Sequence, residues 1–112
     1  MKLIALLTLA VATFAIFALS AGGAAAKSRK CSNVTVRISG SDFTYPVRVM
    51  KGSVRCRTAR STLKGFIKSG SQPRGWQCFD GHSGQNWAAT CVVVGSGGHT
   101  RKQIRAYNPI AG

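Results

Sequence analysis

The sequence predicts an α+β domain in which one helix packs on a small antiparallel sheet, in the order β-β-α-β-β-β. One stretch, Gly52 to Gly70, has apolar residues at helical spacing and ends at a glycine. The stretches on either side of it alternate apolar and polar residues, as half-buried strands do. The four cysteines fall among these elements, so we also expect two disulfide bonds.

Two strands are expected before the helix. In both, apolar residues alternate with polar ones. The apolar residues are Val34, Val36 and Ile38 in the first strand and Tyr45, Val47 and Val49 in the second. The residues from Ser39 to Asp42 indicate a turn, so the two strands should form a hairpin. Pro46 has no N–H to donate, and we therefore expect it at a sheet edge or at the start of its strand.

The central helix has one apolar stripe. At 100° per residue, about one third of the circumference is occupied by apolar side chains, namely Cys56, Ala59, Leu63, Phe66 and Ile67. Ser53 suits the N-cap position, and Gly70 suits the left-handed position that ends a helix. Thr58, Thr62 and Gly65 are expected on the solvent side, where Gly65 costs about 1 kcal/mol relative to alanine.

Three strands are expected after the helix, over 76–79, 87–94 and 101–107. The residues that share an inward face are Trp76 with Cys78, then Trp87, Ala89, Cys91 and Val93, then Ile104 with Ala106. Both tryptophans are expected in the core, because tryptophans in strand patterns usually pack there. Trp87 borders a polar loop, and the alternative for it is stacking on bases or sugars.

Four cysteines allow three disulfide pairings. We predict Cys31–Cys56, because a hairpin brings the start of its first strand near the helix, and Cys78–Cys91 across the later strands. Cys31 has the wrong parity for the face of Val34 unless the strand begins after it. A zinc site is not expected because no C-x-x-C pair is present, and we predict neither a metal nor a cofactor.

Residues 1–26 have the features of a signal peptide. Lys2 precedes an apolar run from Leu3 to Leu19, and Ala24-Ala25-Ala26 is an A-x-A cleavage site. The alternative, an uncleaved anchor, would be at the short limit for a membrane span. Residues 27–112 are then one small disulfide-stapled domain with a basic leader and a short tail. We expect a monomer without a transmembrane span, secreted to the exterior or bound to the envelope.

Four motifs of the chain occur in the same order in a known group of proteins. They are C-x-x-V-x-V from Cys31, G-x-V-x-C-x-x-A-R from Gly52, G-[WF]-x-C from Gly75, and a final strand with Cys91 before a basic hairpin at 101–105. In these motifs the chain resembles small secreted four-cysteine proteins of actinobacterial lineages, over nearly all of residues 27–112. The resemblance implies a fold and a compartment but no activity, because its motifs are structural and the group is uncharacterised.

The charge of the chain favours anionic partners. There are 16 Lys and Arg against 2 Asp and Glu, a net charge of +14, which attracts polyanions by counterion release. Beside the apolar stripe lies a basic one of Arg57, Arg60, Lys64 and Lys68, and secondary charge comes from Arg29, Lys30, Arg101, Lys102 and Arg105. We predict a non-enzymatic domain whose basic stripe associates with anionic polymers, the envelope surface or nucleic acid. The simpler alternative is a soluble basic surface with no specific site.

The sequence leaves two alternative functions. A small secreted nuclease would use His82 or His99 as acid or base, but nothing in the sequence brings the two together. A cationic antimicrobial or toxin would need an exposed apolar face, whereas the apolar stripe of the helix is expected to be buried. No catalytic residue is therefore predicted.

Overall fold

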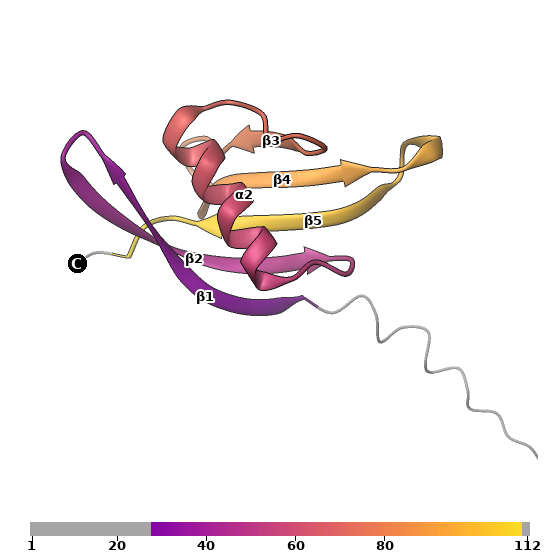
Figure 1. The fold of residues 1–112 in the computed structure, drawn as a ribbon, viewed down its shortest axis with the longest axis horizontal. Helices are drawn as coiled ribbons and strands as arrows, with labels where there is room; N and C mark the ends of the chain where they lie inside the picture. The colour runs from indigo at the N-terminus through magenta and orange to yellow at the C-terminus, as the bar shows by residue number, and fades with distance from the viewer. Residues whose placement is uncertain (1–27, 111–112) are drawn as a thin grey trace, which may run out of the picture.

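The computed structural model describes residues 28–110. The strands and the helix follow in the predicted order: β1 (Arg29–Ile38), β2 (Ser41–Lys51), α2 (Cys56–Ser69), β3 (Gln77–Asp80), β4 (Trp87–Val94) and β5 (Thr100–Tyr107), with a short 3-10 turn η1 (Ser96–Gly98) between the last two (Figure 1). The predicted fold class is confirmed. The predicted signal peptide lies outside the described residues.

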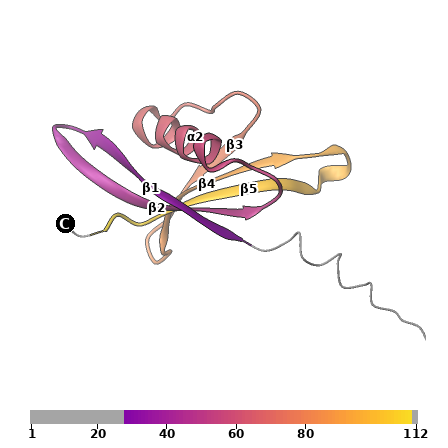
Figure 2. The ribbon, with the colours of Figure 1, turned by 60° about the horizontal axis from the view of Figure 1, so that its bottom comes forward.

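The five strands form one antiparallel sheet in the order β1-β2-β5-β4-β3. The last strand, β5, lies in the middle, between the hairpin of β1 and β2 and the hairpin of β3 and β4. Figure 2 shows α2 lying across one face of this sheet. The described part of the chain therefore has two layers, and the face of the sheet away from α2 is called the open face below.

The core lies between α2 and the sheet. Its most deeply buried side chains have less than 2% of their surface exposed and are Leu63, Ile104, Val36, Val47, Val49 and Cys91. The helix contributes Ala59, Leu63 and Phe66 to it, and Ile67 and Cys56 pack partly buried against it. Each large apolar side chain buried in this way stabilises the fold by about 1.5–3 kcal/mol. The predicted stripe is confirmed, but Thr62 was wrongly placed in solvent and is buried as well.

The two ends of α2 differ in how they are capped. The N-cap is Arg55, which makes no side-chain capping bond, so the prediction of Ser53 at this position is wrong. Arg55 has an extended backbone, the preceding side chain of Val54 is buried, and the helix begins at Cys56, which its disulfide ties to β1. At the other end, Gly70 has a left-handed φ of 75° and its N–H donates to the carbonyl of Phe66 at 2.7 Å, as predicted.

A β-bulge in β1 changes the face of its first residues. The register to β2 shifts between Cys31 and Val34, and both side chains are buried on the helix side. The bulge therefore removes the parity conflict expected for Cys31. Pro46 lies inside β2, opposite this bulge, so the prediction of a strand start is wrong. The pairing of β2 with β5 begins only at Val47, and Pro46 therefore lies just outside that ladder, at a local edge. An edge and a bulge are both positions where a strand tolerates proline.

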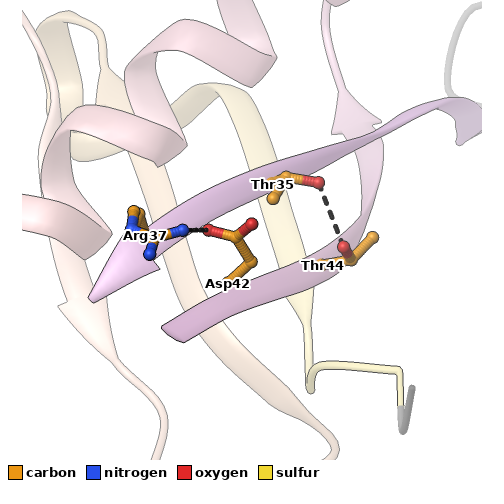
Figure 3. A network of polar contacts seen from close by, with 4 residues as sticks. All are labelled: Thr35, Arg37, Asp42 and Thr44. Atoms are coloured by element: carbon orange, nitrogen blue, oxygen red, sulfur yellow. Dashed lines mark hydrogen bonds and ion pairs between the residues drawn. The ribbon is translucent and has the colours of Figure 1, made fainter. Parts of the chain in front are cut away.

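The hairpin of β1 and β2 turns in two residues. Ser39 and Gly40 both have positive φ, 52° and 86°, as the common two-residue hairpin turn requires. The turn is thus shorter than the predicted span. Beside it, on the open face, Arg37 forms an ion pair of 3.1 Å with Asp42 (Figure 3). Two register pairs further along and on the same face, the hydroxyls of Thr35 and Thr44 share a hydrogen bond of 3.0 Å.

Both predicted disulfides are present. Cys31–Cys56 joins β1 to the first residue of α2, and Cys78–Cys91 joins register partners on β3 and β4. The first bond fixes the helix over the β1 edge of the sheet, and the second closes the opposite edge.

Candidate functional site

Three of the four predicted cations meet at a hollow between α2 and β1. The hollow has a volume of about 210 Å³ and is lined by Arg57, Arg60, Ser61 and Lys64 from the helix and by Val34 from the strand. Arg57 and Lys64 are exposed and Arg60 is half-buried. Lys68 follows Lys64 one helical turn later and is exposed, so it extends the same surface without lining the hollow.

The guanidinium of Arg60 is held in place by the bulge of β1. Its Nε and Nη2 atoms donate hydrogen bonds to the carbonyl of Asn33 at 3.3 and 3.2 Å, and Asn33 lies between the shifted register positions. No hydrogen bond among residues 28–110 uses its Nη1 atom, so that end of the guanidinium can donate to an anion. The sequence does not reveal this contact: the parity mismatch between Cys31 and Val34 is the trace of the bulge in β1, but it does not show which carbonyl the bulge presents to the helix.

Among residues 28–110, no carboxylate lines the hollow. The two acidic residues of the chain are Asp42 and Asp80. Asp42 pairs with Arg37 on the open face, and this is the one ion pair between residues 28 and 110. Asp80 lies on β3, at the edge of the sheet opposite β1. The positive charge of Arg57, Arg60 and Lys64 is therefore not neutralised by the described part of the chain.

The two histidines are far apart. His82 lies in the loop between β3 and β4, and His99 follows η1 between β4 and β5. These loops are at opposite ends of β4, which has 8 residues and so spans roughly 25 Å. The structure does not bring the two imidazoles together. Among the described residues there is also no group of three or more His, Cys, Asp or Glu that could hold a metal ion.

A second basic and aromatic cluster lies on the open face. The sequence offers Arg105 as secondary charge and base stacking as the alternative for Trp87, but it does not bring the two together. The register shifts between Trp87 and Ala89, so Trp87 pairs with Tyr107 and faces away from the helix, and its predicted core position is wrong. The guanidinium of Arg105 lies 5.1 Å from the centre of the Trp87 ring, and its Nε donates to Thr90 Oγ1 at 3.0 Å. Trp76 packs partly buried against the core, as predicted.

The other secondary cations do not extend the hollow into one continuous surface. Arg29 donates to the carbonyl of Val54 and to Cys56 Sγ, the latter at 3.6 Å, and so covers the Cys31–Cys56 disulfide. Lys30 and Arg105 belong to the open face, and Arg101 is exposed at the start of β5. Between residues 28 and 110, no helix has the length and apolar character needed to cross a membrane.

Comparison of the chain with protein-family models, with curated proteins and with solved structures gives no match. The resemblance to small secreted four-cysteine proteins therefore stays a prediction.

Proposed function

We propose that the protein is a secreted, non-enzymatic domain that binds anionic polymers through the hollow between α2 and β1. The observation that carries this proposal is that Arg57, Arg60 and Lys64 line one concave surface from which carboxylates are absent within residues 28–110. Like charges that gather without a counter-charge repel one another, and a bound phosphate or sulfate relieves that repulsion.

The geometry suits the phosphate groups of a polymer. An arginine donates to two oxygens of a phosphate at once, and Arg60 is already oriented by Asn33, so less side-chain freedom is lost on binding. Lys68 adds a cation one turn along the helix, as contact with a repeating chain of phosphates would require. Binding of this kind releases counterions, does not depend on sequence and weakens as salt is added.

The disulfides support export. Such bonds persist in oxidising compartments and are rare in the cytosol, so two of them in a small domain favour an extracellular or envelope location. The two alternative functions have less support. A nuclease based on His82 and His99 has its two imidazoles at opposite ends of β4, and a membrane-active toxin would need the apolar stripe of α2, which is buried in the core.

The test compares two variants of equal charge. The helix-face variant carries Arg57→Gln, Lys64→Gln and Lys68→Gln, and the control variant carries Lys51→Gln, Arg74→Gln and Arg101→Gln. Both remove three charges from exposed positions, and Arg60 is kept in both because of its contact with Asn33. Heparin, double-stranded DNA and vesicles of anionic phospholipid are titrated with the oxidised protein across a salt series.

The helix-face variant should lower the slope of log K against log salt by about 2 to 3 for DNA, and the control variant by clearly less. A preference for vesicles over the two polymers would identify lipid headgroups as the source of the phosphates. Equal changes in the two variants would show that the charge acts diffusely, and the proposal of a site on α2 would be wrong.

A further inference from the structure

A row of register partners crosses the open face from one sheet edge to the other. It consists of Lys30 on β1, Arg48 on β2, Arg105 on β5, Thr90 on β4 and Phe79 on β3, and we call it the open-face row. Its cations alternate along their strands with buried residues such as Val47 and Ile104, so their side chains point away from α2. The row is separate from the hollow, which lies on the helix side.

Three cations are direct neighbours in this row. Side chains paired across antiparallel strands have Cβ atoms about 4.5–5.5 Å apart, and like charges at such positions are destabilising. Lys30 pairs with Arg48, and Arg48 pairs with Arg105. The carboxylate on this face belongs to Asp42, which is paired with Arg37 near the hairpin turn (Figure 3). Between residues 28 and 110 the row therefore has no acidic partner, and an anion would complete it.

Aromatic side chains border the cations. Trp87 lies under the guanidinium of Arg105 and pairs across the strands with Tyr107, whose hydroxyl lies 3.5 Å from Met50 Sδ. At the other end of the row Phe79 keeps 51% of its surface exposed. Aromatic and guanidinium planes next to cations are the combination on which unpaired bases stack while phosphates are neutralised.

We propose that the open face binds single-stranded nucleic acid, with phosphates on Lys30, Arg48 and Arg105 and bases stacked on Trp87 and Phe79. Charge complementarity selects a polyanion, and the exposed aromatic surface selects one that presents unpaired bases. In a nucleic-acid duplex the bases are stacked inside the double helix, so a duplex could contact the cations of the row but not the aromatic side chains. The proposal does not depend on the function proposed for the hollow.

The experiment uses a matched pair of probes, an oligothymidylate of about twelve nucleotides and an abasic oligomer with the same number of phosphates. The oxidised protein should bind the oligothymidylate at least about fivefold more tightly than the abasic oligomer, as one stacked base predicts. Trp87→Leu should reduce that preference, and Trp87→Leu combined with Phe79→Leu should abolish it. Arg48→Gln with Arg105→Gln should lower the salt slope by about 1.4, and the helix-face variant should keep the preference for bases.

Tryptophan fluorescence gives a second measure of base stacking, and it needs no substitution of the arginines. The chain has two tryptophans, so Trp87→Phe leaves Trp76 as the remaining emitter. Oligothymidylate should quench the wild-type emission more than the abasic oligomer does, and the difference should vanish in Trp87→Phe. Equal affinity for the two probes would overturn the proposal. So would loss of oligothymidylate binding in the helix-face variant alone, a result that places nucleic acid on the hollow and leaves the function proposed there intact.

Discussion

Removal of the Cys31–Cys56 disulfide is expected to cost the fold a large part of its stability. The bond joins residues 25 apart in the sequence, for which loop-closure entropy predicts about 3.5 kcal/mol. Cys78–Cys91 has a separation of 13, for which the same relation gives about 3 kcal/mol. A domain of this length has a free energy of unfolding of about 4–12 kcal/mol, so the two bonds together supply a substantial share of it.

The measurement is urea unfolding followed by circular dichroism. The variants Cys31→Ala with Cys56→Ala, and Cys78→Ala with Cys91→Ala, are compared with the oxidised protein and with the protein in excess reductant. Each pair variant should lose about 3 kcal/mol, and the reduced protein, which loses both contributions, should unfold at a much lower urea concentration than the oxidised protein. The first pair should also weaken heparin binding, because that bond fixes α2 over β1 and hence shapes the hollow.

Two results would refute this reasoning. A loss below about 1 kcal/mol in either pair variant would show that packing against α2 holds the sheet without the bonds. Reduced protein that unfolds at the same urea concentration as oxidised protein would show that the fold does not need an oxidising compartment. The structural argument for export would then fail.

Three further predictions concern single positions. Gly65→Ala should stabilise the protein by about 1 kcal/mol, because the added methyl meets nothing within 4 Å; a lowered melting temperature would contradict this. Gly81→Ala should destabilise it by about 2 kcal/mol or more, because a Cβ there would lie 1.9 Å from the Trp87 carbonyl oxygen, and an unchanged urea midpoint would show that the loop adjusts freely. Burial raises the pKa of Tyr45 above its ordinary value of 10.0, so the unfolded chain ionises first and stability falls as pH rises through that ordinary value. Tyr45→Phe should reduce this alkaline loss in urea midpoints, and an unaltered pH profile would count against it.

The elements that the sequence predicts well are those with a regular period. Val34 and Val36 alternate with polar neighbours in β1, and Ala59, Leu63 and Phe66 recur at helical spacing in α2. Their burial follows from these periods, because each element must bury its apolar side. The disulfide pairing follows in turn, since the hairpin places the start of β1 next to the start of α2.

The features that the sequence does not predict depend on two register shifts. One lies between Cys31 and Val34 and presents the Asn33 carbonyl to Arg60. The other lies between Trp87 and Ala89 and turns Trp87 to the open face. A bulge is decided by pairing with a partner strand and by the twist of the sheet. The parity mismatch between Cys31 and Val34 is consistent with the first shift but does not fix its position, and no such mismatch precedes the second. The cations of α2 could therefore be predicted from the sequence. The hollow that they line and the aromatic cluster on the open face of the sheet could not.

The positive charge and the disulfides of this domain have opposite effects on its free energy of unfolding. The whole chain has a net charge of +14, and residues 28–110 contain one ion pair, so self-repulsion opposes compaction of the fold. The disulfides offset that repulsion in the free protein by limiting the unfolded chain, whereas a bound polyanion offsets it by binding the folded state preferentially. Because the variant that lacks Cys31–Cys56 should bind heparin more weakly, heparin should raise its melting temperature by less than it raises that of wild type. Because the hollow and the open-face row lie on opposite sides of the sheet, stabilisation by heparin and by oligothymidylate should be additive if each occupies its own face. Competition between the two ligands would mean that one surface binds both.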